Sequence, residues 1–174
     1  MIYMSSATEH TDGTYVIFRL GAEEYGLEIG KVQSIVHFDQ PTPVPKSDES
    51  IMGVLNLRGK VIPIVDVARR LGRERFRPGS GSRIIVVEGD AGLMGLAVDS
   101  ANEVTEIRGD QIQAAPAAVL GAEGLEVFDG VANRDGALVI LMNLDRAVPR
   151  VEYVHLGETV ALEGEFDVQD RSRS

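Results

Sequence analysis

Short apolar runs follow one another along most of this chain, separated by breaks that contain glycine or polar turn residues. The runs are rich in Val, Ile and Leu, and β-branched residues pack well in strands. Many short strands with frequent turn signals are typical of barrels and sandwiches, whereas βαβ sheets alternate strands with longer helices. The predicted strands are TYVIFRLG, EEYGLEI, VQSIVHF, SIMGVLNL, KVIPIVDV, RIIVVEG, LMGLAVD, NEVTEI, LEVFDGVA and ALVILMNL.

Helix signals are confined to two short segments. In DVARRLG, Asp66 stands where a helix N-cap is needed and Gly72 where a helix stops. In NLDRAVP, Asn143 is the predicted cap and Pro149 the stop. We therefore predict a mainly β fold with short helices.

An internal repeat becomes visible when the two halves of the chain are aligned. At an offset of 77 residues, GVLNLRG and the helix after it fall on GVANRDG and its helix. Further upstream the offset is 69, and there YVIFR falls on IIVVE and Gly26 on Gly95. The change in offset predicts a longer middle loop in the second copy. We interpret the chain as two similar β units, at about 14–72 and 83–148, with two unrelated hairpins of similar design as the alternative.

Composition narrows the class of protein. A chain of 174 residues with 44% hydrophobic residues can bury a core as one domain or two small subdomains. The net charge of -10 disfavours nucleic acid and anionic membranes as partners. The absence of cysteine excludes disulfides and thiolate metal sites, and no leader or membrane span is predicted. We therefore expect a cytoplasmic location, a flexible arm over 1–13, and a tail over 150–174 whose last part is disordered.

Candidate catalytic chemistry is sparse. The three histidines, His10, His37 and His155, are far apart in sequence, so neither a histidine-based triad nor a metal site is indicated. The GSGS segment at 79–82 precedes a strand rather than a helix and lacks the P-loop lysine, so we interpret it as a flexible link. We predict no catalytic residue, no cofactor and no metal. Arg58 at the tip of the NLRG turn is the remaining candidate, and a solvated turn residue is the alternative.

Two segments, EEYGLEIGKVQSI and IMGVLNLRGKVIPIVDV, resemble the most recognisable blocks of the CheW-like domain family. GLAVDSANEVTEI, QIQAAP and VFDGVANRDGALVILMNL are similar to its second half, in the same order. The resemblance covers about 15–149 and implies a CheW-like domain over 14–149. It implies a fold of two interlocked five-stranded SH3-like β-barrels. It also implies a non-enzymatic adaptor that couples chemoreceptors to the histidine kinase CheA.

The resemblance further implies where partners bind. The C-terminal regulatory domain of the kinase is expected to dock on the first unit, at Ile29, Gly30 and Val32. The helical tip of a methyl-accepting chemoreceptor is expected in a groove between the units, which would recruit the adaptor to membrane arrays through protein contacts alone. The expected receptor-binding residues are Ser34, Ile35, Gly53, Val54, Arg58, Gly95 and Ala101.

One residue departs from the family pattern. The position after KVQ is commonly a glutamate that pairs with the arginine of NLRG, and here it is Ser34. Arg58 therefore lacks its usual partner, which leaves Glu28, Asp39 or a charge on the receptor as alternatives. A different function also stays open at this point, namely a regulatory domain that binds a small metabolite in the cleft between the barrels.

Overall fold

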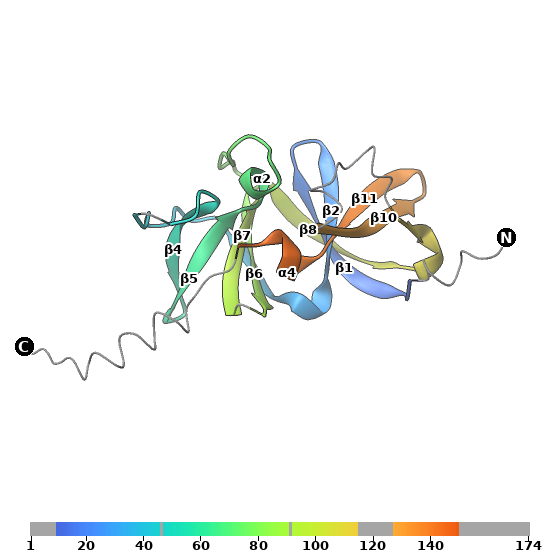
Figure 1. The fold of residues 1–174 in the computed structure, drawn as a ribbon, viewed down its shortest axis with the longest axis horizontal. Coiled ribbons are helices and arrows are strands. Elements are labelled where there is room, and N and C mark those ends of the chain that lie inside the picture. Colours follow the sequence, from blue (N-terminus) through green and yellow to red (C-terminus); the bar gives the residue numbers. More distant parts are fainter. Residues whose placement is uncertain (1–9, 46, 91, 115–126, 150–174) are drawn as a thin grey trace, which may run out of the picture.

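The computed structural model describes residues 10–45, 47–90, 92–114 and 127–149 (Figure 1). Strands dominate this part of the chain, and each helix is a single short turn. In chain order the elements are β1 (Gly13–Leu20), β2 (Glu23–Glu28), the 3-10 turn η1 (Ile29–Lys31), β3 (Val32–His37), β4 (Ile51–Leu57), β5 (Lys60–Asp66), α2 (Val67–Arg70), β6 (Arg83–Gly89), β7 (Gly92–Val98), β8 (Ser100–Ile107), the 3-10 turn η2 (Gly109–Gln111), β9 (Ile112–Gln113), β10 (Phe128–Arg134), β11 (Ala137–Met142) and α4 (Leu144–Ala147).

The strands form two sheets, which lie side by side along the long axis of the molecule (Figure 1). The five-stranded sheet, here the first barrel, has the order β3-β6-β7-β5-β4. The six-stranded sheet, here the second barrel, has the order β8-β1-β2-β11-β10-β9, in which β9 adds two residues. The mainly β prediction with two interlocked barrels is confirmed. The sheets do not coincide with the sequence units 14–72 and 83–148, because the first hairpin of each unit belongs to the barrel of the other.

The strand register follows both offsets of the sequence repeat. Each barrel contains one parallel contact, Ile64 beside Gly95 in the first and Leu141 beside Gly26 in the second. These two pairs are equivalent under the offsets of 77 and 69. The register also shifts at equivalent places, between Ile51 and Gly53 in one hairpin and between Phe128 and Gly130 in the other. The repeat is therefore structural, and it places equivalent residues in equivalent environments.

Apolar side chains gather in three clusters. The central core lies between the barrels and takes residues from both, including Phe18, Tyr25, Ile85 and Leu96. The interior of the second barrel contains Ile17, Ile107, Ile112, Ala132, Val139 and Leu141. The interior of the first barrel contains Ile62, Ile64, Phe76, Ile84, Val86 and Ala97.

The two predicted helices form with the predicted caps. Asp66 accepts a hydrogen bond from the Arg69 backbone at 3.0 Å, and Asn143 accepts one from the Arg146 backbone at 3.3 Å. Each cap satisfies a backbone donor that the first helical turn would otherwise leave without a partner.

The segment between the two repeats is held at several points. Its Phe76 is buried, and the Phe76 N–H donates to the second carboxylate oxygen of Asp66 at 2.8 Å. Gly79 donates its N–H to the Ser82 hydroxyl at 2.8 Å, and Ser82 returns a backbone bond to Gly79. The prediction of a flexible GSGS link is wrong, because these bonds close it into a turn with Ser82 buried.

Candidate binding surfaces

The predicted kinase-binding residues lie where the chain crosses from the second barrel to the first. Ile29 and Gly30 belong to η1, and both are exposed, with 42% of Ile29 accessible. Lys31 in the same turn forms an ion pair of 3.4 Å with Asp145 of α4. Val32 is half-buried, because it packs against the central core. Of the three predicted residues, Ile29 and Gly30 thus present the larger surface.

Arg58 lies at the same end of the first barrel as η1. The register of β5, β7, β6 and β3 brings the β4–β5 turn, the β6–β7 turn and η1 to this end. Arg58 is exposed and forms no ion pair or hydrogen bond with any residue that the structure describes. Neither Glu28 nor Asp39 therefore replaces the missing glutamate at Ser34.

The β4–β5 turn places Arg58 in an unusual backbone conformation. Arg58 has φ 55° and Gly59 has φ 85°, as in a two-residue type I′ hairpin. Asn56 supports the turn by accepting the Gly59 N–H at 3.0 Å. The equivalent turn contains Asp135 with φ 53°, supported by Asn133. Left-handed backbone disfavours arginine more than aspartate, because the short Asp side chain can bond locally.

Ser34 and Ile35 lie on β3, at one edge of the first barrel. Ser34 is half-buried, and Ile35 is 36% exposed at the rim of the central core, opposite the buried Ile85. The repeat equivalent of Ile35 is Val104 on β8, which is 54% exposed. Two rims of the central core therefore carry an accessible aliphatic residue, one on each side of the junction between the barrels.

Three predicted receptor-binding residues lie inside the fold. A Cβ on Gly53 would stand 2.2 Å from the Thr42 carbonyl oxygen. The absence of a side chain at Gly53 therefore lets the backbone at Thr42 pack directly against β4. Gly95 is buried where the parallel strands meet, and Ala101 belongs to the central core. Since these residues offer no surface to a partner, we correct the predicted contact set by removing them. Val54 is half-buried, and its backbone bonds Thr42 in both directions at 2.9 Å.

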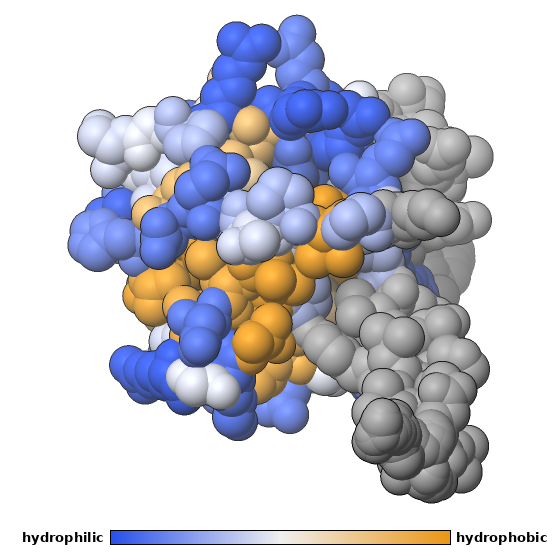
Figure 2. All heavy atoms as spheres, turned by 90° about the vertical axis from the view of Figure 1, so that its left-hand side faces the viewer, coloured by the Kyte–Doolittle hydropathy of each residue, from blue (hydrophilic) through white to orange (hydrophobic). Residues whose placement is uncertain are grey.

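One apolar area at the surface was not predicted from the sequence. Figure 2 faces the end of the molecule that carries β4 and β5, and shows an apolar area surrounded by polar side chains. Six partly buried apolar residues pack on the interior of the first barrel, and we call this set the open apolar surface. Its residues are Val36, Phe38, Met52, Leu55, Leu57 and Leu93.

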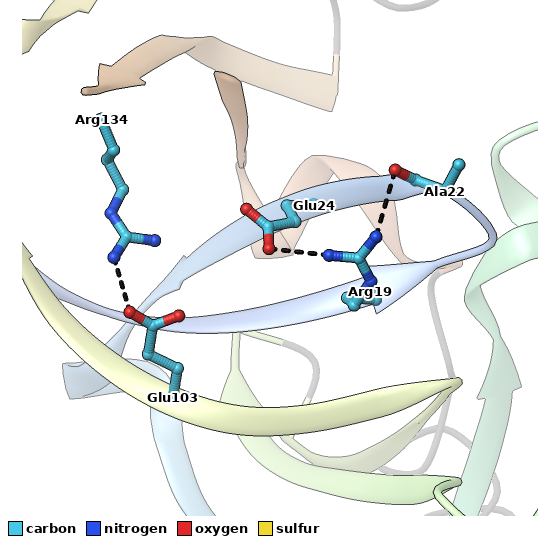
Figure 3. Close-up of polar contacts among 5 residues, drawn as sticks. All are labelled: Arg19, Ala22, Glu24, Glu103 and Arg134. Carbon is cyan, nitrogen blue, oxygen red and sulfur yellow. Dashed lines mark hydrogen bonds and ion pairs between the residues drawn. The ribbon is translucent and has the colours of Figure 1, made fainter. Parts of the chain in front are cut away.

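The second barrel is closed by a polar contact at the equivalent place. Arg134 of β10 donates to Glu103 of β8 at 2.5 Å, which joins strands from opposite sides of this sheet (Figure 3). The repeat equivalents in the first barrel are Leu57 and Ser34, which cannot form an ion pair. A comparison of the two repeats, residue by residue, is the signal that could have revealed the open apolar surface.

Ionisable groups form one linked contact between the second barrel and the segment after α2. Burial raises the pKa of Tyr25, and the hydrogen bond that its hydroxyl donates to Glu23 raises it further. Burial also acts to raise the pKa of Glu23, but hydrogen bonds from Arg73 and Tyr25 outweigh it and hold that pKa below its ordinary 4.5. The raised pKa keeps the Tyr25 hydroxyl protonated, so the arrangement indicates a structural link.

The described ranges, 10–45, 47–90, 92–114 and 127–149, contain neither a cluster of metal ligands nor a membrane span. No group of three or more His, Asp or Glu residues there is placed to hold a metal ion. No helix there is both long enough and apolar enough to cross a bilayer.

Comparisons with known proteins agree with this architecture of two interlocked barrels. The CheW-like domain family matches residues 14–152, so the chain belongs to the CheW-like domain family. A chemotaxis protein CheW of Rhizobium meliloti is 32% identical over 152 residues, which are 86% of this chain and 97% of the relative. A CheW of Klebsiella aerogenes is 31% identical over 148 residues, covering 84% and 87% of the two chains. The crystal structure of the scaffolding protein TtCheW from Thermoanaerobacter tengcongensis superposes with a TM-score of 0.69 at 33% identity, covering 76% of this chain and 90% of that one.

Proposed function

We propose that this protein is a non-enzymatic adaptor that couples chemoreceptors to the histidine kinase CheA in chemotaxis-type signal transduction. Family membership supports the role, since relatives that match most of the chain are chemotaxis CheW proteins and the similar structure is a scaffolding protein. The structural observation that carries the proposal is the open apolar surface beside the exposed η1 turn. Apolar surface framed by polar residues is what protein interfaces present.

The kinase side of the adaptor is the first barrel. Ile29 and Gly30 form an exposed corner at one end of this barrel, and a Cβ on Gly30 would meet open space. The open apolar surface adds partly buried aliphatic residues on the barrel interior. We assign the C-terminal regulatory domain of the kinase to this region, because exposed aliphatic anchors beside packed ones are typical of binding hot spots.

The receptor side uses the rim of the central core. Ile35 is accessible there, with Ser34 beside it and Val54 half-buried on β4. A receptor tip is a helical hairpin, and helices dock through aliphatic contacts oriented by a few charges. Arg58 is kept at a backbone position that disfavours it and has no partner among the described residues. Unfavourable backbone of this kind concentrates at functional sites, which supports a contact role for Arg58.

The proposal places the protein in the cytoplasm, held at membrane receptor arrays through protein contacts. It involves neither nucleic acid nor direct membrane contact, in keeping with the net charge of -10. Catalysis is not part of the role.

Calorimetric titration with the regulatory domain of CheA tests the kinase side. Wild-type protein should bind it, and Ile29→Glu should abolish binding because a charge would be buried without a partner. Leu138→Glu is the matched control, since Leu138 is 61% exposed and lies on the second barrel. Thermal unfolding of each variant must stay near wild type. If Leu138→Glu weakens binding as much as Ile29→Glu, the assignment to the first barrel is wrong.

Receptor coupling is tested separately with Arg58→Ala. An exposed turn residue contributes little to folding, so the free energy of unfolding should change by at most about 0.5 kcal/mol. If Arg58 meets a carboxylate or a helix end on the receptor, binding should weaken by about 1–3 kcal/mol. Wild-type receptor affinity and kinase activation in both Arg58→Ala and Arg58→Glu would show that Arg58 is a solvated turn residue.

A further inference from the structure

A pocket of about 460 Å³ opens where the two barrels meet the segment between the repeats. One wall is the β1–β2 turn at Leu20 and Gly21, another is Ala68 of α2, and a third is the segment from Arg73 to Gly79. The walls therefore come from both barrels. A volume of this size lies within the usual range for small-molecule sites, roughly 300–1,000 Å³, and exceeds what a single inorganic ion needs.

The segment beside the pocket concentrates positive charge in an otherwise acidic chain. RRLGRERFR, from 69 to 77, contains five arginines, while the whole chain has a net charge of -10. Three of the five are engaged by other groups. Arg69 pairs with Glu49, the Arg70 side chain donates to the Ala147 carbonyl at 2.9 Å, and Arg73 pairs with Glu23.

The two remaining arginines, Arg75 and Arg77, line the pocket and are exposed. Neither forms an ion pair or hydrogen bond with any other residue in the described ranges. Phe76 between them is buried and held by the carboxylate of Asp66, so the backbone that carries both side chains is fixed. Two guanidinium groups on a fixed segment are pre-organised for an anion, because each presents a planar fork that matches phosphate oxygens.

The repeat shows what the second copy does at the equivalent place. Asp145 is the equivalent of Ala68, and its carboxylate accepts the Asp90 N–H at 2.8 Å and contacts Lys31 at 3.4 Å. In the first copy Ala68 supplies no charge. The Gly21 N–H is already taken by Asp99 at 2.6 Å, so the charged donors in the lining that have no partner among the described residues are the guanidinium groups of Arg75 and Arg77. The second copy thus has an internal ion pair at this place, whereas Arg75 and Arg77 line the pocket beside the carboxylates of Glu74 and Asp99 without an ion pair or hydrogen bond to either.

We infer that this pocket binds a phosphate-bearing small molecule of nucleotide size, with Arg75 and Arg77 on its phosphates. Leu20, Ala68 and Phe76 give the pocket apolar walls for the less polar part of the ligand. A ligand that touches walls from both barrels binds the folded arrangement and stabilises it by mass action. The site is independent of the proposed adaptor function, and either assignment can fail without the other.

Calorimetric titration of the full chain with magnesium-free ATP, pyrophosphate and adenosine tests the inference. ATP should bind with a stoichiometry of one, pyrophosphate more weakly, and adenosine not at all. The double variant Arg75→Gln/Arg77→Gln should weaken ATP binding at least ten-fold. Its matched control is Arg108→Gln/Arg146→Gln, which removes the same charge from exposed arginines elsewhere and should change the affinity less than two-fold.

Three outcomes would overturn the inference. The first is no ATP binding at millimolar concentration, and the second is equal weakening in both double variants, which would mean general electrostatic association. The third is tighter binding of a hexaglutamate peptide than of ATP, which would assign the arginines to an acidic protein segment. Thermal unfolding of each variant without ligand must match the wild type. Ala68→Asp gives an additional check, since the carboxylate it adds should compete with ATP for the pocket.

Discussion

The first and second barrels have equivalent strand orders, but they differ in the number of partly buried apolar residues that pack on their interiors. In the second barrel, Tyr15 is the one partly buried apolar residue that packs on the interior cluster, counting the described residues alone. In the first barrel, six such residues pack on the interior cluster. At the place where Glu103 and Arg134 join β8 to β10 in the second barrel, the first has Ser34 and Leu57.

This difference shows that two copies of one fold can keep the same backbone features and still present different surfaces. The repeat preserves the parallel contact, the strand bulges, the helix caps and the hairpin turns in both copies. What it does not preserve is the ion pair that joins β8 to β10 in the second barrel. An ion pair at such a place contributes little to stability, so replacing it with a partly exposed leucine is tolerated. The open barrel then keeps apolar surface that a partner can cover.

The largest expected effect is on stability, at the two glycines where a neighbouring backbone segment packs against a hairpin. Gly53→Ala should destabilise the protein by about 2–4 kcal/mol, because the new Cβ meets the Thr42 backbone at 2.2 Å and φ is 148°. Gly130 is its repeat equivalent, and a Cβ there would lie 2.8 Å from the Gln113 carbonyl oxygen. Gly130→Ala should cost less, about 1–3 kcal/mol. Denaturant unfolding measures both, and a larger cost at Gly130 would contradict the comparison.

An exchange of the closing residues tests the open apolar surface directly. Ser34→Glu/Leu57→Arg gives the first barrel the ion pair of the second, and should weaken kinase binding by about 2 kcal/mol or more, roughly 30-fold. The reciprocal variant Glu103→Ser/Arg134→Leu should lose at most about 1 kcal/mol of stability and leave kinase binding unchanged. Titration with the kinase domain and thermal unfolding measure the two effects. Unchanged kinase affinity in the first variant would remove the open apolar surface from the proposed interface.

The hairpin turns give a smaller effect of the opposite sign. Arg58→Gly should stabilise the protein by about 0.5–1 kcal/mol, because glycine adopts φ 55° without steric cost. Asp135→Gly, with φ 53°, should gain less, since aspartate tolerates this conformation better than arginine. If Arg58 has a contact role, its glycine variant should fold more stably and bind the receptor more weakly. If Asp135→Gly stabilises the protein as much as Arg58→Gly does, then the left-handed backbone destabilises the protein no more at Arg58 than at Asp135.

The smallest expected effect is on the ion pair between Glu23 and Arg73. The second copy has Gly92 in place of Glu23, so it lacks this carboxylate. The pKa of Glu23 is lowered, so its contribution to stability is present above the pKa of the unfolded carboxyl and is lost as the pH falls through the folded value. Both side chains are 41% exposed, so Glu23→Gln should cost about 0.2–1 kcal/mol at pH 7. The cost should vanish well below pH 4.5, as thermal unfolding across pH would measure. A difference that persists in acid would assign the effect to packing.

Much of the fold could be predicted from local signals in the sequence. The caps at Asp66 and Asn143 and the turn at Asn56 and Gly59 depend on neighbouring residues alone, and the structure contains all of them. The structure also agrees with the predicted alignment of Gly26 with Gly95, because both glycines lie where parallel strands approach closely. Such features need no knowledge of which strands are partners.

Strand partnership was the part that the sequence could not supply. An alternating pattern shows that a strand has a buried face, but it does not say which sheet receives that face. Gly95 and Ala101 were therefore expected in a groove, whereas the exchange of hairpins buries both. The ion pair of Glu103 with Arg134 was missed for the same reason, since it joins β8 to β10, which are not neighbours in the sheet.

The exchange of hairpins has a consequence for how this protein is made on the ribosome. The β2 strand emerges early, yet Gly26 must wait until its partner Leu141 has been synthesised. At roughly 5–20 residues per second, that interval is on the order of ten seconds. During this time the outer edge of β2 has no native partner within the second barrel, and unpaired edges invite association with other chains. Neither barrel is complete before much of the other has been translated, so a truncated or slowly translated chain should depend on chaperones more than two barrels built in sequence would.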